Sequence, residues 1–159
     1  ESKTRPMGRN ASGVRGITLN GPNDAVVGMV SVNDLDTDIL VVSANGYGKR
    51  SSLEDYRATN RGGKGVKTIS VTEKTGELVS IKNVSDENDL MIINKSGIAI
   101  RMSVDSLRVM GRATQGVKLI NLKGDDSIAA VAKVMKEEET IEDQTLEGEE
   151  NATDGTNIE

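Results

Sequence analysis

The chain has 159 residues, with 20 Lys or Arg, 25 Asp or Glu and a formal net charge of −5. It contains no Cys and no His, which excludes disulfides, zinc sites built from thiolate or imidazole, and catalysis by a histidine base. No apolar run is long enough to span a bilayer and no signal-peptide pattern is present, so we expect a soluble, cytoplasmic protein with one core.

Three basic, glycine-containing segments recur along the chain at offsets of 52 and 51 residues. We call them box 1 (Arg5 to Leu19, RPMGRNASGVRGITL), box 2 (Arg57 to Val71, RATNRGGKGVKTISV) and box 3 (Arg108 to Leu122, RVMGRATQGVKLINL). Each box begins with Arg, has a second Arg four residues later, and reaches Gly-Val followed by a basic residue. Between the boxes, ILVVSANGYGKRSSLEDY and LMIINKSGIAIRMSVDSL repeat at an offset of 51, so the chain is a tandem array.

Turn residues divide each repeat into four short predicted strands. The first follows the Gly-Val of the box; the others are a run such as Leu78 to Val84, a run such as Leu90 to Ile93, and a strand after a tight turn such as Asn45-Gly46. Helical spacing is absent apart from a single turn near Leu53 or Leu107. Four strands in a period of about 51 residues are typical of a β-propeller blade, so we expect an all-β fold.

The negative charge is concentrated at the C-terminal end of the sequence. Residues 136–159 hold one Lys against ten Asp or Glu, a net charge of −9, whereas residues 1–135 sum to +4. Because residues 136–159 have few large apolar side chains and no periodicity, we expect a disordered acidic tail. Its simplest role is to aid solubility.

The three boxes, the NGYGKR hairpin and the VMGRATQGV segment resemble the C-terminal domain of DNA gyrase A over about residues 1–136. The family's box reads Gln-Arg-Arg-Gly-Gly-Lys-Gly; Arg61 to Gly65 match its last five residues, while boxes 1 and 3 are degenerate. The resemblance implies part of a six-bladed β-pinwheel, a propeller variant, with residues 1–135 as the part that binds duplex DNA. Because two full periods and a third box are fewer than the about four to eight blades of a closed propeller, we expect the last blades of a longer domain.

The resemblance further implies DNA wrapping within a bacterial enzyme on the chromosome, in which gyrase A and gyrase B form a heterotetramer that uses ATP to introduce negative supercoils. We expect no catalytic site, metal or cofactor in this chain, with ATP and magnesium acting elsewhere in the holoenzyme. Lys64 is followed by Gly65 and not by the Ser or Thr of a P-loop, and the Asp34 to Asp38 turn lacks the glycine of a calcium loop. Two alternatives remain open: the equivalent domain of topoisomerase IV, and a propeller that binds protein partners.

The cations and glycines that recur in the boxes are the candidate contacts to DNA. Glycine lets the backbone approach a phosphate closely, and Lys or Arg neutralises it. The alternative interpretation is a linker between blades, whose glycines permit positive φ and whose cations are solvated. If the boxes bind DNA, the acidic tail would compete for the same cations. The candidates from the boxes are Arg9, Arg15, Arg61, Gly62, Gly63, Lys64, Gly65, Lys67, Arg112 and Lys118, and the weaker candidates from the hairpins are Lys49, Arg50 and Arg101.

Overall fold

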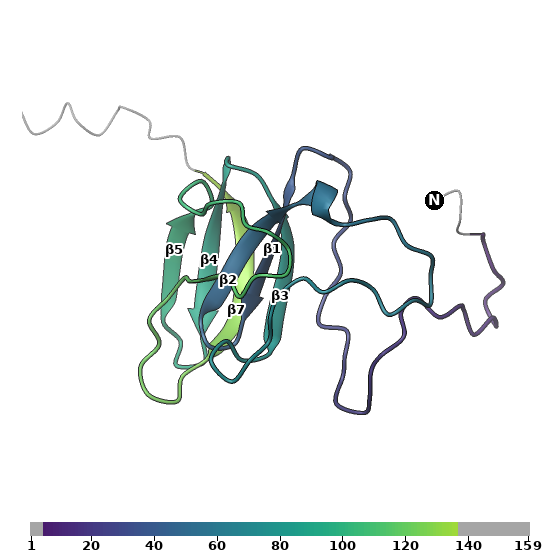
Figure 1. Ribbon diagram of the computed structural model, residues 1–159, viewed down its shortest axis with the longest axis horizontal. Coiled ribbons are helices and arrows are strands. Elements are labelled where there is room, and N and C mark those ends of the chain that lie inside the picture. The colour runs from purple at the N-terminus through teal and green to yellow at the C-terminus, as the bar shows by residue number, and fades with distance from the viewer. Residues whose placement is uncertain (1–4, 137–159) are drawn as a thin grey trace, which may run out of the picture.

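Two antiparallel β-sheets lie side by side in the computed structural model and share one apolar core (Figure 1). The structure describes residues 5–136, so the predicted acidic tail lies outside the described residues apart from Lys136. The elements are β1 (Asp38–Ser43), β2 (Tyr47–Ser52), the single 3-10 turn η1 (Leu53–Asp55), β3 (Leu78–Val84), β4 (Asn88–Asn94), β5 (Ala99–Ser103), β6 (Val117–Lys118) and β7 (Ile128–Met135).

Each sheet combines strands from different repeats. The first sheet has the order β3-β1-β2-β6 and the second the order β5-β4-β7. In both sheets a hairpin, β1–β2 or β4–β5, pairs with the strand that follows the next box, which is β3 or β7. The all-β prediction is confirmed, and so are the predicted strands over Leu78 to Val84 and Leu90 to Ile93 and the turn near Leu53. Within residues 5–136, no helix is long and apolar enough to cross a membrane.

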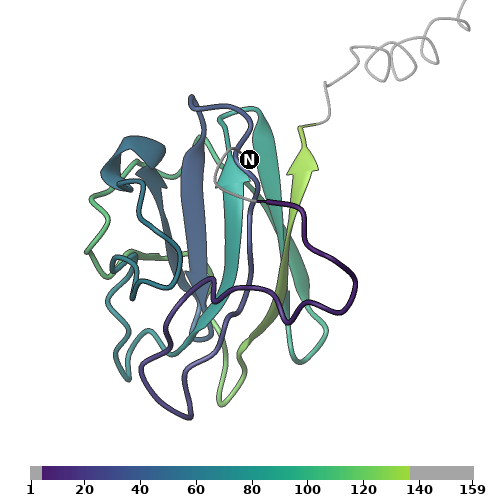
Figure 2. The same cartoon turned by 90° about the vertical axis from the view of Figure 1, so that its right-hand side faces the viewer.

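Strand β1 of the first sheet is buried on both of its faces. Its side chains alternate between faces, and five of its six residues are buried. Leu40 and Val42 face the core shared with the second sheet. Ile39 and Val41 face the opposite way, toward Ile69 of box 2 and the N-terminal segment. In Figure 2 that segment crosses in front of the strands, while Figure 1 shows its first part lying away from the sheet, so the contacts with the outer face are made by Ile69 of box 2 and by Val30 and Val32.

The prediction of a strand after every Gly-Val is wrong for boxes 1 and 2. Among the described residues only box 3 contributes one, the two-residue strand β6, which pairs Lys118 with Tyr47 of β2. Within residues 5–136, box 3 pairs with the hairpin strand β2, whereas box 2 is paired with no hairpin. Residues 26–32, which correspond to β3, likewise form no strand and leave Val26 and Met29 exposed. A strand needs its partner, and local propensity alone does not supply one.

Candidate nucleic-acid interface

Boxes 1 and 2 are joined by main-chain and hydroxyl hydrogen bonds. The Thr18 N–H donates to the carbonyl of Gly63 at 2.9 Å, and the Thr18 hydroxyl donates to the carbonyl of Gly62 at 2.5 Å. A third bond runs from the Gly62 N–H to the carbonyl of Gly16 at 2.9 Å. These bonds fix the Gly-Gly turn of box 2 against the extended end of box 1.

Boxes 2 and 3 repeat this connection at equivalent positions. The Ser70 N–H donates to the carbonyl of Thr114 at 3.2 Å, and the Ser70 hydroxyl donates to the carbonyl of Ala113 at 3.0 Å. Ser70 lies 52 residues after Thr18, and its acceptors lie 51 residues after the acceptors in box 2. The three boxes therefore form one row. The hydroxyl residues Thr18 and Ser70 stand at the same place in two repeats, and this is the sequence signal for the connection. A prediction based on cations and glycines does not include them.

The glycine that precedes the valine of each box has a positive φ. Gly13, Gly65 and Gly116, which precede the valine of each box, have φ values of +80°, +77° and +84°. These angles support the view that the glycines shape the loop. Gly63 differs, because it is exposed and a Cβ added there would make only ordinary contacts. Gly63 thus leaves the box 2 turn without a side chain at that point, and its neighbour Gly62, with a φ of +76°, turns the chain.

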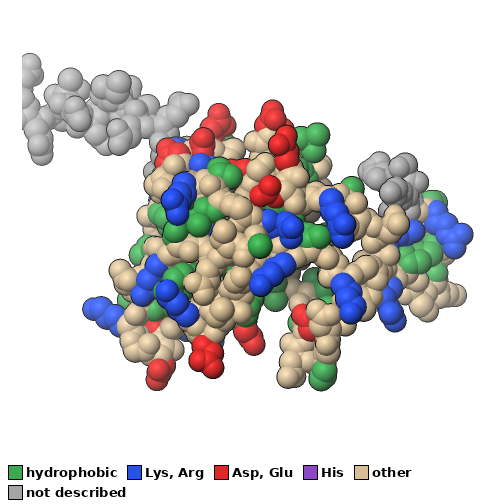
Figure 3. Space-filling view, viewed as in Figure 1, with side chains coloured by type: hydrophobic (Ala, Val, Ile, Leu, Met, Phe, Trp, Pro, Cys, Tyr) green, Lys and Arg blue, Asp and Glu red, His purple; other side chains and the backbone are tan. Residues whose placement is uncertain are grey.

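Most of the predicted box cations are exposed. No hydrogen bond or ion pair joins Arg61 or Lys64 to another residue of the described range 5–136. Figure 3 shows Lys and Arg side chains in a band across the middle of one face, with Asp and Glu mainly above and below it. Arg112 is half-buried and donates to the carbonyl of Lys67 at 2.6 Å, so its guanidinium also links two boxes. The predicted box cations that are exposed are Arg9, Arg15, Arg61, Lys64, Lys67 and Lys118.

Lys49 does not lie on this surface. Its side chain is 1% exposed, and its ammonium donates to the carbonyl of Gly111 at 2.7 Å, to the carbonyl of Arg112, and to the hydroxyl of Thr114 at 3.2 Å. Burial lowers the pKa of Lys49. The prediction that Lys49 contacts phosphate directly is therefore corrected, because its three donors are used inside the protein.

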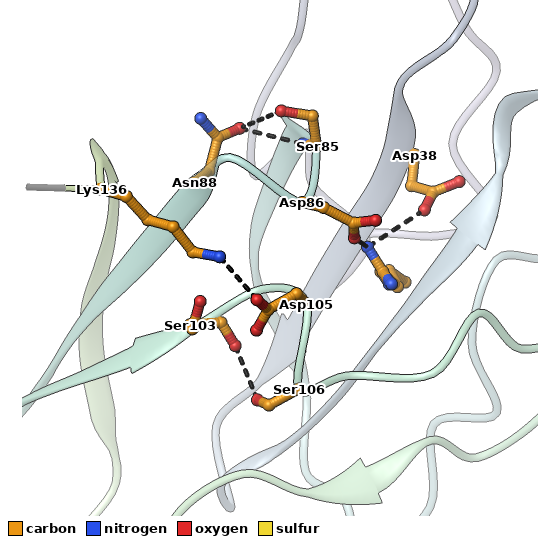
Figure 4. Close-up of polar contacts among 9 residues, drawn as sticks. Asp38, Ser85, Asp86, Asn88, Ser103, Asp105, Ser106 and Lys136 are labelled. Atoms are coloured by element: carbon orange, nitrogen blue, oxygen red, sulfur yellow. Dashed lines mark hydrogen bonds and ion pairs between the residues drawn. The ribbon is translucent and has the colours of Figure 1, made fainter. Parts of the chain in front are cut away.

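Arg50 is also buried, beneath two carboxylates. Its guanidinium lies 2.5 Å from Asp86 and 3.6 Å from Asp38, and both carboxylates point toward it (Figure 4). Burial raises the pKa of Asp38, and the nearby Arg50 charge opposes that shift. The Arg50 carbonyl accepts a bond from the N–H of Met110 in box 3. We therefore correct its assignment too: Arg50 joins the hairpin, the turn that follows β3, and box 3, and its charge is engaged within the chain.

Arg101 lies on β5, in the second sheet, and no described contact brings it to the boxes. Its guanidinium donates to Asp89 at 2.8 Å and to the carbonyl of Met135 at 3.2 Å. Only about a third of its side chain, 34%, is exposed, so much of its charge faces these partners and not the solvent. The three hairpin candidates, Lys49, Arg50 and Arg101, thus bind partners within the chain, whereas most of the box candidates are exposed.

Close packing explains the glycines of the NGYGKR hairpin. A Cβ on Gly48 would lie 2.5 Å from Leu119 Cδ1 and 2.8 Å from the carbonyl oxygen of Val41. A Cβ on Gly46 would lie 2.7 Å from the carbonyl oxygen of Ile120. The hairpin therefore provides the surface on which box 3 docks.

The arrangement offers cations and main-chain amides in a row, and this suits a polyanion. Among the described residues, no group of three or more Asp, Glu, His or Cys is placed to hold a metal ion. The row of boxes is the only feature of residues 5–136 in which the predicted functional residues gather across three repeats.

Comparison with known proteins gives consistent matches. The family model described as DNA gyrase C-terminal domain, beta-propeller, matches residues 5–33, 37–85 and 88–135. The DNA gyrase A protein of Staphylococcus aureus strain NCTC 8325 / PS 47 is 48% identical over 98% of this chain, and that of strain MRSA252 is 46% identical over 97%. The chain spans only 18% of the length of these relatives.

Two solved structures share the fold. A structure of the DNA gyrase A C-terminal domain has a TM-score of 0.73 and 28% identity, covering 82% of this chain and 44% of its own. The C-terminal domain of DNA topoisomerase IV has a TM-score of 0.71 and 18% identity, covering 77% of this chain and 38% of its own. The second likeness concerns the fold alone.

Proposed function

This chain belongs to the DNA gyrase C-terminal domain family, and from that premise we propose that it binds and wraps duplex DNA. It does so as a non-catalytic part of gyrase A, within a bacterial type II topoisomerase whose holoenzyme also contains gyrase B and supercoils DNA in the cytoplasm. ATP and magnesium act in other parts of that holoenzyme.

The observation that carries the proposal is the row of three boxes. Hydrogen bonds at equivalent positions hold neighbouring boxes together, and the cations of box 2 remain exposed beside them. A row of cations and amides neutralises successive phosphates, and a curved row imposes curvature on the duplex without reading its bases. The proposed contacts are Arg9, Arg15, Arg61, Gly62, Gly63, Lys64, Gly65, Lys67, Arg112 and Lys118.

The test is duplex binding by the full chain across a series of salt concentrations. The double variant Arg61→Ala/Lys64→Ala should weaken binding to all duplex sequences alike and flatten the slope of log K against log salt by about two units, about one for each lost contact. The matched control is Lys95→Ala/Lys133→Ala, which removes two exposed lysines outside the boxes and should change the slope little. Equal slopes for the two double variants would refute the phosphate contacts.

The same experiment separates the alternatives. A chain that shows no salt-dependent duplex binding would favour a propeller that binds protein partners. The topoisomerase IV alternative is decided by the assembled enzyme, which should supercoil DNA if the proposal is right and mainly decatenate it if the alternative is right.

A further inference from the structure

The turn of box 3, residues 111–114, has its carbonyl groups directed into the protein. The carbonyls of Gly111 and Arg112 both accept from the buried ammonium of Lys49. The carbonyls of Ala113 and Thr114 accept from the side chain and main chain of Ser70 in box 2. Donors from two other repeats thus fix all four carbonyl groups.

A trans peptide group points its C=O and its N–H in opposite directions, and none of the described peptide bonds is cis. The peptide groups that present the Gly111 and Arg112 carbonyls to Lys49 therefore direct the N–H groups of Arg112 and Ala113 away from it. Within the described residues, neither N–H donates a hydrogen bond. Ala113 is exposed and Arg112 is half-buried, so these two adjacent main-chain donors lie at or near the surface of the box row.

The contacts of Lys49 suit its charged form. The Thr114 hydroxyl uses its own proton in a bond to the Gly111 carbonyl at 2.9 Å, so it accepts from Lys49. All three partners of the amine are then acceptors, and an ammonium has the three protons that they require. Asp55 attracts this charge only at longer range, since no ion pair binds Lys49 within the described residues. A buried positive charge behind two outward N–H groups favours an anion in front of them.

We propose that Lys49 is a positioning residue that makes the box 3 turn a main-chain anion site, in which the N–H groups of Arg112 and Ala113 bind a phosphate of duplex DNA. The inference rests on the proposed function and deepens it. It also accounts for a difference between the hairpins, because the position of Lys49 is occupied in the next repeat by Ile100, which packs against the core.

The first experiment uses the wild-type chain and follows its amide resonances by NMR. Titration with inorganic phosphate and then with a short duplex should shift the amides of Arg112 and Ala113 in a saturable way. If the duplex binds while these two amides stay unshifted, the anion site is refuted and the proposed function stands. If the wild-type chain shows no salt-dependent duplex binding at all, the proposed function is what fails.

The second experiment compares Lys49→Met with Lys82→Met, a lysine replacement on β3 of the same sheet. Folding is checked by urea unfolding, so that affinities are compared for folded protein. Lys49→Met should abolish the two amide shifts and weaken duplex binding about tenfold, although the Lys49 side chain is buried. Lys82→Met should keep the two amide shifts and the wild-type duplex affinity. A folded Lys49→Met variant with wild-type affinity and wild-type amide shifts would leave Lys49 a purely structural role. If Lys49→Met does not fold, the titration of the wild-type chain still decides whether the amides of Arg112 and Ala113 bind phosphate.

Discussion

The hairpins β1–β2 and β4–β5 occupy the same place in consecutive repeats, but they meet different neighbours. Hairpin β1–β2 has β3 on one edge and β6 of box 3 on the other, whereas in the described part of the chain β4–β5 pairs only with β7. The positions that contact box 3 read Gly46, Gly48, Lys49 and Arg50 in the first hairpin. The equivalent residues of the second hairpin are Gly97, Ala99, Ile100 and Arg101.

This difference shows that an equivalent position in a repeat does not imply an equivalent role. In the first hairpin the small residues admit the backbone of box 3 and the two cations bind its carbonyls or nearby carboxylates. In the second hairpin, Ala99 is exposed and Ile100 packs against the core. The segment that docks on a hairpin therefore restricts which side chains that hairpin can carry.

The largest expected effect separates the two tight turns. Gly46 and Gly97 both have positive φ, at +83° and +87°, but only Gly46 has a close neighbour where a Cβ would lie. Gly97→Ala should lower the free energy of unfolding by about 1 kcal/mol through backbone strain alone, and Gly46→Ala by about 3 kcal/mol through strain and overpacking against Ile120. Urea unfolding of the two variants measures the difference, and equal losses would contradict docking as the reason for Gly46.

A smaller difference should separate the two arginines. The Arg50 side chain is 10% exposed and contacts Asp38 and Asp86, whereas the Arg101 side chain is 34% exposed and pairs with Asp89. Arg50→Met should lower the free energy of unfolding by about 2 kcal/mol, since it removes a buried guanidinium that bridges two carboxylates, and Arg101→Met by about 1 kcal/mol, since the guanidinium removed there is more exposed. Thermal or urea unfolding would test this order, and a larger loss for Arg101→Met would overturn it.

The smallest expected effect concerns Asp105, which follows β5. It pairs with Lys136 at 2.6 Å (Figure 4), and the hydrogen bond from Lys136 is the first of the contacts that hold the pKa of Asp105 below its usual value. A lowered pKa in the folded state makes the carboxylate stabilising above the unfolded pKa, and this contribution is lost as the pH falls through the folded pKa. The stability difference between wild type and Asp105→Asn should therefore be constant from about pH 7 to 5 and shrink toward about pH 2. A difference that grows with acidity would have the wrong sign.

The repeat period predicted much of the fold, because each repeat carries strands whose apolar residues alternate. It could not predict which repeat supplies the partner of each strand. The strand after Gly-Val was expected in all three boxes, yet among the described residues it forms in box 3 alone, where β2 is available to pair with it.

The sequence also predicted the candidate site only in part. Exposed cations such as Arg61 and Lys64 follow from their place in a glycine-rich loop. Lys49 and Arg50 also read as surface cations in sequence, and only the packing of box 3 against the hairpin shows that they are buried. Charge is visible in a sequence, whereas desolvation depends on contacts between residues far apart in the chain.

We propose that the row of boxes curves the duplex as well as binding it. The most direct measurement closes a nicked plasmid with ligase in the presence of the full chain, removes the protein, and determines the linking number of the product. We expect a linking-number change of one sign that grows with protein concentration. At equal amounts of bound protein it should be smaller for Arg61→Ala/Lys64→Ala than for Lys95→Ala/Lys133→Ala. Saturated binding with an unchanged linking number would contradict wrapping by this chain.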